Sequence, residues 1–313
     1  MNTPPSPSGV DSTGEQFATV NTGIELCYET FGDPDDPTIL LVMGLGTQMI
    51  AWDEGFCGML VERGFHVVRF DNRDVGKSTQ VKAKPPTVRQ LVLRDKKAAS
   101  YTLPDMADDA IGLLDHLGVR RAHVVGASMG GMIAQTIAIQ YPERVLSLVS
   151  IMSNEGGRLK GQPTPAGLAL LLRPAPRDRE AYLDHVEKLY RTIGSPGFPA
   201  DIAAVRERAA VGYERGVHPA GVARQMIAVG ASPNRTPGLR RLRVPTTVIH
   251  GKSDILVRIS GGRAVAKAVP DARLVEIEGM GHNLPPGVWP RIVDAIVENA
   301  ARAATDSPTA QPH

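Results

Sequence analysis

The chain has few aromatic residues, two cysteines and no long apolar run. Phe, Trp and Tyr make up 4% of its 313 residues, which argues against a broad surface for stacking ligands. Cys27 and Cys57 are too few for an all-cysteine metal site or a disulfide-rich domain, so we expect two free thiols in the body of the fold. No apolar run reaches the roughly 18–20 residues of a membrane span.

The charge and the two ends of the chain exclude further classes. There are 35 basic and 33 acidic residues, a net charge of +2, and so small an excess does not favour a nucleic-acid partner. The N-terminus lacks the apolar core of a secretory signal, and we expect a soluble, cytoplasmic protein. Small, polar, proline-containing sequence predicts disorder over 1–16 and 304–313.

Between these ends, strand-like and helix-like segments alternate. Short apolar runs are typical of strands buried on both faces of a parallel sheet, and apolar residues spaced three and four apart predict helices at 106–117 and 289–300. The less regular segment 17–29 suits antiparallel strands at one edge. We therefore predict an α/β fold with a mostly parallel sheet flanked by helices. The predicted buried strands are 38–43, 65–70, 123–127, 145–151, 245–250 and 273–277.

One stretch breaks the alternation. Residues 154–240 have helical patterns and many prolines but no convincing strand. A helical insertion between two strands of a sheet is a candidate lid. We therefore predict a core of residues 17–153 and 241–303, with 154–240 as a lid. The leucines of 168–172 would pack this lid on the core, line an apolar acyl pocket, or do both.

A candidate nucleophile lies in Gly126-Ala127-Ser128-Met129-Gly130. This Gly-x-Ser-x-Gly sequence follows a predicted buried strand and precedes a helical pattern. Small residues around Ser128 permit a tight turn that raises its hydroxyl above the sheet at a helix N-terminus. The context therefore favours a nucleophilic serine over a bystander in a glycine-rich turn.

A serine nucleophile needs a base, and the base needs an orienting acid. Asp254 follows the predicted strand that ends at His250, and His282 lies in a glycine-flanked loop after the next strand. Loops at the carboxyl ends of parallel strands share one edge of the sheet. We predict His282 as the base and Asp254 as the acid, with Glu155 as the alternative acid.

Attack on an ester carbonyl also requires donors for the oxyanion. The backbone N–H of Met129, directly after the nucleophile, is one candidate. The other is the N–H of Leu45, in the flexible Gly44-Leu45-Gly46 loop after the first buried strand. Gly44, Gly126 and Gly130 are expected to support these turns.

Together these landmarks resemble the α/β-hydrolase superfamily over roughly residues 17–303. Beside the serine, aspartate and histidine motifs, Met43-Gly44 resembles the family's His-Gly oxyanion loop, and 71–78 resembles its Asp-x-Arg-Gly-x-Gly-x-Ser turn. Met43 replaces a His and Asp74 replaces a Gly. The Met-Gly variant is especially similar to the aclacinomycin methylesterase group and its esterase/lipase-like relatives. The resemblance implies an α/β-hydrolase fold and an esterase.

Other sites are weakly supported. Gly76-Lys77-Ser78 lacks the upstream Gly of a phosphate-binding loop, because Asp71 stands there, and Gly44-x-Gly46 lacks the third Gly of a dinucleotide motif. The eight histidines form no close pair of the kind that binds zinc. His123 and His250 lie in predicted strands and suit structural roles. We therefore expect no metal and no cofactor.

The sequence predicts a cofactor-independent serine hydrolase that cleaves a small-molecule carboxylic ester through an acyl-enzyme. The substrate would carry an apolar acyl group or a bulky hydrophobic group, and Trp52 and Tyr190 are candidates for lining its cavity. The same three residues also serve thioesterases, C–C bond hydrolases and perhydrolases. A ligand receptor with little turnover is the alternative from another class.

Overall fold

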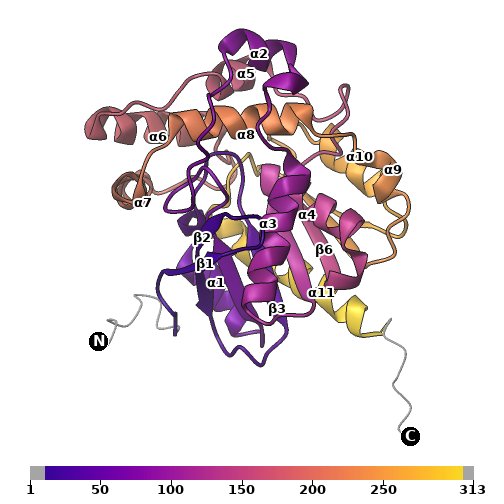
Figure 1. The fold of residues 1–313 in the computed structure, drawn as a ribbon. Helices are drawn as coiled ribbons and strands as arrows, with labels where there is room; N and C mark the ends of the chain where they lie inside the picture. Colours follow the sequence, from indigo (N-terminus) through magenta and orange to yellow (C-terminus); the bar gives the residue numbers. More distant parts are fainter. Residues whose placement is uncertain (1–10, 306–313) are drawn as a thin grey trace, which may run out of the picture.

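Within residues 11–305, which the computed structural model describes, an eight-stranded sheet runs through the centre with helices on both faces (Figure 1). The spatial order of the strands is β1-β2-β4-β3-β5-β6-β7-β8. The strands are β1 (Gln16–Thr19), β2 (Glu25–Phe31), β3 (Thr38–Val42), β4 (His66–Phe70), β5 (Ala122–Ala127), β6 (Val145–Ile151), β7 (Thr246–Gly251) and β8 (Arg273–Ile277).

The direction of the strands agrees with the sequence prediction. β1 pairs antiparallel with β2, and β2 pairs antiparallel with β4, at one edge of the sheet. All other pairings are parallel. The loops after β3, β5, β6, β7 and β8 therefore leave the same edge, which is where the predicted site residues lie. The predicted α/β-hydrolase fold is confirmed.

Two cores lie on opposite faces of the sheet. Successive residues of a strand point to opposite faces, so Leu40 and Val42 join one core while Ile39 and Leu41 join the other. One core lies under α3, α4 and α10, and the other under α1 and α11. These helices are α1 (Glu54–Val61), α3 (Leu103–His116), α4 (Met129–Gln140), α10 (Ser260–Ala268) and α11 (Trp289–Thr305).

The segment between β6 and β7 is helical and lies above the edge of the sheet from which the predicted site loops leave (Figure 1). We call α5–α9 the inserted helices. The helix α2 (Val88–Leu93) and the 3-10 helix η2 (Lys96–Ala98), between β4 and α3, contact α8 in this layer. The inserted helices are α5 (Pro165–Leu171), α6 (Arg179–Ile193), α7 (Ile202–Arg215), α8 (Pro219–Ala231) and α9 (Thr236–Leu239).

The predicted disordered ends are wrong at their inner boundaries. Ser12 forms a β-bridge with Phe31 and its hydroxyl donates to the carboxylate of Glu29, so 11–16 is held against β2. At the other end, α11 continues to Thr305. The remaining positions of both predictions, 1–10 and 306–313, lie outside the described residues. Within residues 11–305, each helix is too short or too polar to span a bilayer.

Candidate active site

Ser128 occupies a sharp turn between β5 and α4. Its φ of 57° is positive, a conformation that non-glycine residues rarely adopt. The turn is held in place because the Ser128 N–H donates to Ile151 O of β6 at 2.9 Å. Met129 then starts α4, so the serine hydroxyl stands at a helix N-terminus.

The glycines around Ser128 are required by close packing. A Cβ added to Gly126 would overlap the carbonyl of Gly130, and one added to Gly130 would overlap the carbonyl of Val42. A Cβ at Gly44 would lie 3.1 Å from the Ser128 Cβ. The motif therefore brings α4 close to β3 and β5, and brings the loop after β3 beside the serine.

His282 and Asp254 meet Ser128 in a continuous row of hydrogen bonds. His282 Nε2 lies 2.9 Å from Ser128 Oγ, and His282 Nδ1 lies 2.6 Å from Asp254 Oδ2. The three residues follow β5, β7 and β8. The structure thus brings together the predicted nucleophile, base and acid although they are far apart in the chain.

Asp254 is held by its own loop. Its Oδ1 accepts the backbone N–H groups of Leu256 at 2.8 Å and Val257 at 2.9 Å, which leaves Oδ2 for His282. His250 Nε2 lies 3.6 Å from Oδ2 but donates to Val257 O at 2.6 Å. Because burial lowers the pKa of His250, its ring is neutral beside the carboxylate.

The carboxylate of the alternative acid, Glu155, forms no hydrogen bond with His282 among the described residues. It is buried after β6, and its carbonyl oxygen accepts the N–H of Arg235 at 2.8 Å. The charge of Glu155 also acts on the guanidinium of Arg235. His282 Nδ1 uses Asp254 as its partner. The geometry therefore favours Asp254 as the partner of the imidazole.

The loop after β3 presents backbone amides to the same place. Leu45 and Met129 line the cavity that contains Ser128 and His282. In this loop the Gly46 N–H donates to Gln225 Oε1 at 2.8 Å, and the Thr47 N–H donates to Gly44 O at 3.2 Å. For the Leu45 N–H, the structure gives no acceptor among residues 11–305. That amide is consequently available to a ligand.

Residues of the inserted helices hold these loops, and the sequence analysis missed them. Gln225 of α8 accepts from Gly46 as described and donates to Arg73 O at 2.8 Å. Ser195, after α6, accepts the Gly281 N–H at 2.9 Å and donates to Asn283 Oδ1 at 2.6 Å. Neither Gln225 nor Ser195 stands in a sequence motif, so no local pattern could have identified them.

Gln48 and Asp71 connect the loop after β3 to α7. Gln48 donates to the carbonyls of Gly212 and Gly216 at 2.8 and 2.9 Å. Asp71 accepts the Met49 N–H at 2.7 Å and forms a buried ion pair with Arg215. The family resemblance predicted a turn at 71–78, but only the fold shows that Asp71 of this turn pairs with Arg215 on α7.

Asp74, which replaces the family's Gly in this turn, has a function of its own in the fold. Its φ is 71°, the region that a glycine would adopt without strain. Its buried carboxylate binds Arg224 of α8 at 2.6 and 2.8 Å and accepts the Tyr101 hydroxyl at 2.7 Å. The side chain thus joins the turn to an inserted helix, which a glycine could not do.

A cavity of about 910 Å³ opens between Ser128 and the inserted helices. Its lining is mostly apolar and includes Met132 and Leu171. Leu168 and Tyr190, which the sequence offered as candidates for lining a cavity, also lie there. Leu168 is 48% exposed, so it does not serve the core. Trp52, by contrast, is fully buried and stacks on Phe56 at 5.4 Å, so its predicted place in the cavity is wrong.

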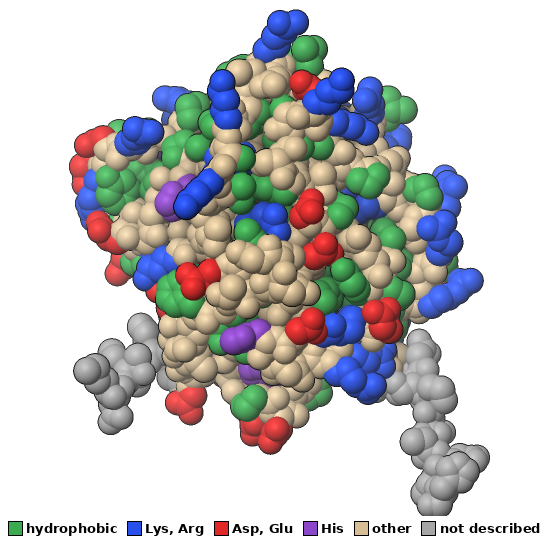
Figure 2. All heavy atoms as spheres, viewed as in Figure 1, with side chains coloured by type: hydrophobic (Ala, Val, Ile, Leu, Met, Phe, Trp, Pro, Cys, Tyr) green, Lys and Arg blue, Asp and Glu red, His purple; other side chains and the backbone are tan. Residues whose placement is uncertain are grey.

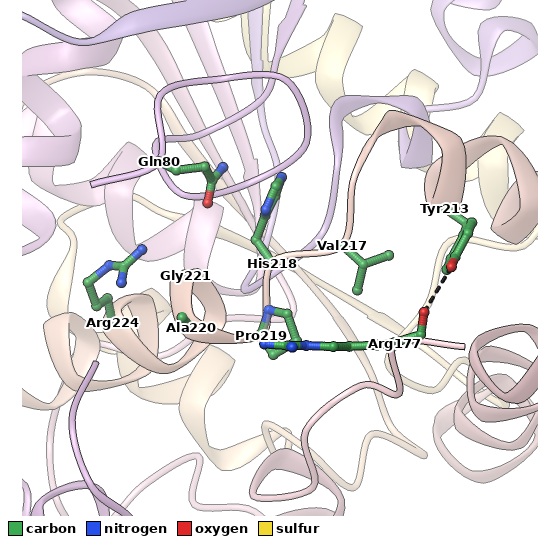
Figure 3. A pocket seen from close by; sticks show the side chains of 9 residues that line it. All are labelled: Gln80, Arg177, Tyr213, Val217, His218, Pro219, Ala220, Gly221 and Arg224. Carbon is green, nitrogen blue, oxygen red and sulfur yellow. Dashed lines mark hydrogen bonds between the residues drawn. The ribbon is translucent and has the colours of Figure 1, made fainter. Parts of the chain in front are cut away.

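A second cavity, of about 590 Å³, lies beside the turn between α7 and α8 (Figure 3). Three of its polar side chains, those of Arg224, His218 and Tyr213, already have partners in the fold. Arg224 is bound by Asp74, His218 Nε2 donates to Gly76 O at 3.0 Å, and the Tyr213 hydroxyl donates to Arg177 O at 2.8 Å. None of the predicted site residues lines it.

The two cysteines are free and buried, as predicted. Burial raises the pKa of Cys27 and of Cys57 to about 12, so both thiols stay protonated at neutral pH. His123 bonds Ser147 Oγ through Nδ1 at 2.9 Å inside the sheet. This contact and the bond from His250 to Val257 are consistent with the structural roles expected of these histidines.

Comparison with known proteins identifies the family. A model of proteins with the alpha/beta hydrolase fold matches residues 37–285. The chain belongs to the α/β-hydrolase family. It is 32% identical to the rhodomycin D methylesterase DnrP of Streptomyces peucetius, covering 91% of this chain and 97% of that one. DauP of Streptomyces sp. strain C5, also named a rhodomycin D methylesterase, is 32% identical over 90% and 96%.

Among solved structures, a thermophilic esterase from Thermogutta terrifontis matches this member of the α/β-hydrolase family with a TM-score of 0.68. The two sequences are 25% identical, and the match covers 93% of this chain and 99% of that one. The two methylesterases and this esterase support the prediction of a carboxylic ester hydrolase. The resemblance to a methylesterase group, inferred from the Met-Gly variant, is confirmed.

Proposed function

We propose that this carboxylic ester hydrolase removes a small alcohol, such as methanol, from the ester of a bulky, largely apolar carboxylic acid. The row from Ser128 Oγ through His282 to Asp254, at the floor of a cavity of about 910 Å³, carries this proposal. A volume of that size accommodates a drug-sized ligand. The relatives named rhodomycin D methylesterase support a methyl ester as the group that is cleaved.

The proposed reaction has two halves with the same base. Ser128 Oγ attacks the carbonyl carbon as His282 Nε2 takes the hydroxyl proton. Asp254 keeps the proton of the imidazole on Nδ1 and stabilises the imidazolium. The carbon–oxygen bond to the alkoxy group then breaks, and His282 returns the proton to the leaving alcohol. Water next attacks the acyl-enzyme, loses a proton to His282, and releases the acid as Ser128 regains its hydrogen.

The developing oxyanion would be bound by the N–H groups of Leu45 and Met129. Both residues line the cavity at Ser128, and the Met129 amide lies at the N-terminus of α4, where the helix dipole favours negative charge. Gly44, Gly126 and Gly130 permit the close approach of the two segments. In this proposal the inserted helices form a lid that supplies most of the apolar wall.

The test supplies methyl esters of bulky aromatic acids as substrates. Chromatography measures the release of the corresponding acids. We expect turnover by the natural sequence and none by Ser128→Ala, with the same circular dichroism spectrum for both proteins. A fluorophosphonate should label Ser128 and no other residue. Full activity of Ser128→Ala would contradict the assignment of the nucleophile.

The same experiment distinguishes the alternative functions. If Ser128 is labelled but only thioesters are turned over, the protein is a thioesterase. Cleavage of vinylogous diketones alone would indicate a C–C bond hydrolase, and acyl transfer to peroxide alone would indicate a perhydrolase. Absence of labelling in the folded protein would indicate a ligand receptor.

A further inference from the structure

We propose that the cavity selects esters that carry a second, anionic group, bound at the cavity mouth by Arg94, Lys96 and Arg158. These three residues are called the rim cations. The inference rests on the proposed function and adds a substrate class to it: an apolar ester with a carboxylate remote from the bond that is cleaved, such as the monoester of a dicarboxylic acid.

The first observation is the sign of the charges along the cavity. Within the described residues, no Asp or Glu side chain lines it, although the chain has 33 acidic residues. Its charged lining consists of the rim cations and Arg208. Arg208 forms an ion pair with Asp53 at 3.2 Å. The unpaired charge of the lining is therefore positive and belongs to the rim cations.

The second observation is that the rim cations have no carboxylate partner in residues 11–305. Arg94 donates to a neutral group, Gln162 Oε1, at 2.9 Å. Lys96 and Arg158 form no ion pair with any described residue. Asp95 stands between two of them in the sequence, but its carboxylate caps η2 by accepting the Lys97 N–H at 3.1 Å, and it does not line the cavity.

The third observation is that two separate segments are joined at this rim. Gln162 binds Arg94 through its oxygen, and its Nε2 donates to Gly157 O at 3.0 Å and to Lys160 O at 3.2 Å. One amide side chain thus fixes the end of α2 against the loop that carries Arg158. The positive side chains are brought to one mouth by this bridge.

The backbone of Arg94 supplies a fourth observation. Arg94 ends α2 with φ 50° and ψ 49°, the left-handed conformation that favours glycine. An arginine is disfavoured here relative to glycine. Glycine would suit the local backbone better, and what arginine adds is a guanidinium at the cavity. Figure 2 shows Lys and Arg side chains gathered along the top of the molecule, where Figure 1 places α2 and α5.

The inner wall has the complementary chemistry. Near Ser128 the cavity is lined by apolar side chains, including Leu45, Met129 and Met132. An ester with an apolar body would bury that body there, and an anion at its far end would reach the rim cations. The cavity does not suit an ester that carries an ammonium group, because that group would meet like charges at the mouth.

The experiment uses monomethyl esters of straight-chain dicarboxylic acids of increasing length, each beside the methyl ester of the monocarboxylic acid of equal length. We expect kcat/KM to favour the charged ester about ten-fold at one optimal length. This preference should shrink in molar salt, because exposed charges are screened. In Arg94→Gly/Lys96→Gln/Arg158→Gln, KM for the charged ester should rise about ten-fold while KM for the neutral ester stays unchanged.

The control variant removes the same number of charges outside the cavity. Arg89→Gln/Lys97→Gln/Lys160→Gln alters the neighbouring residues, none of which lines the cavity. It should leave both KM values unchanged. An equal change of KM for charged and neutral esters in the rim variant, or the same effect in the control variant, would overturn the inference.

A binding measurement keeps the inference separate from the proposed function. In a Ser128→Ala background, 8-anilinonaphthalene-1-sulfonate carries an anion, and N-phenyl-1-naphthylamine is its neutral counterpart. The rim variant should lose about ten-fold in affinity for the anionic dye alone. If the rim variant loses this affinity but the protein with Ser128 intact turns over no ester, the proposed function is rejected and the anion site is retained. If esters are turned over but the rim variant binds the anionic dye as tightly as its parent does, the function is retained and the site is rejected.

Discussion

The side chain of Gln225, on α8, accepts the backbone N–H of Gly46 at 2.8 Å, and so fixes the loop whose neighbouring amide, that of Leu45, is the proposed oxyanion donor. Gln225 is fully buried, and its Nε2 donates to Arg73 O. An inserted helix is thereby coupled to the geometry of the serine site. A donor placed by this coupling would act in the transition state more than in substrate binding.

Gln225→Met should therefore lower kcat about ten-fold with little change in KM, because the Gly46 amide loses its acceptor and the loop is released. Gln225→Glu retains an acceptor for Gly46 but replaces the donor to Arg73 O with a carboxylate oxygen, so it should recover only part of kcat. Steady-state kinetics on a methyl ester measures both. A rise in KM at constant kcat would assign Gln225 to substrate binding instead.

Asp254→Asn should lower kcat about 10⁴-fold, because an amide at this position favours the wrong tautomer of His282. The matched control is Glu155→Gln, which changes the other buried carboxyl group at the same edge of the sheet and should leave kcat unchanged. Kinetics on one methyl ester compares the two. The reverse pattern would make Glu155 the orienting acid.

Gly130→Ala should destabilise the protein by about 3 kcal/mol or more, since its Cβ would overlap the carbonyl of Val42 where α4 approaches β3. Gly212 of α7 provides the control. A Cβ there would lie 3.8 Å from Ile50, an ordinary contact, and alanine in a helix is favoured over glycine by about 1 kcal/mol. Urea unfolding should show loss of stability for the first variant and none for the second.

His123 should make the protein sensitive to acid. Burial, with a smaller effect of Arg121, lowers the pKa of His123 from 6.5 to about 4. Between these values the unfolded chain binds a proton that the folded protein does not, so the free energy of unfolding falls as the pH decreases. The loss from pH 6.5 to 5 is about 2 kcal/mol for this residue.

His123→Gln keeps a polar partner for Ser147 and removes the titrating group. Urea unfolding near pH 7.5 and pH 5 should show a smaller loss of stability on acidification in this variant than in the natural protein, by about 2 kcal/mol. The lowered pKa values of His66 and His250 act in the same direction and remain in both proteins. An identical pH dependence would mean that the pKa of His123 is the same in the folded and the unfolded protein.

Local sequence was sufficient to predict the sheet and the elements that carry the candidate site. The apolar runs around Leu40, Val124 and Val248 could be recognised because each is short, buried on both faces and followed by a polar or glycine-rich loop. The turn at Ser128 could also be predicted, since only glycine fits at Gly126 and Gly130. These features depend on neighbours in the chain, and local sequence reports them.

The contacts between groups that are distant in the chain could be learned only from the fold. Asp254 and Glu155 both follow parallel strands, and only the fold shows that Asp254 is the partner of His282. The fold also buries Trp52 in the core. Gln225 and Gln162 belong to no motif, because the role of a side-chain amide that bridges two segments depends on which backbone groups lie beside it. Those contacts arise from packing between residues remote in sequence, which local patterns do not encode.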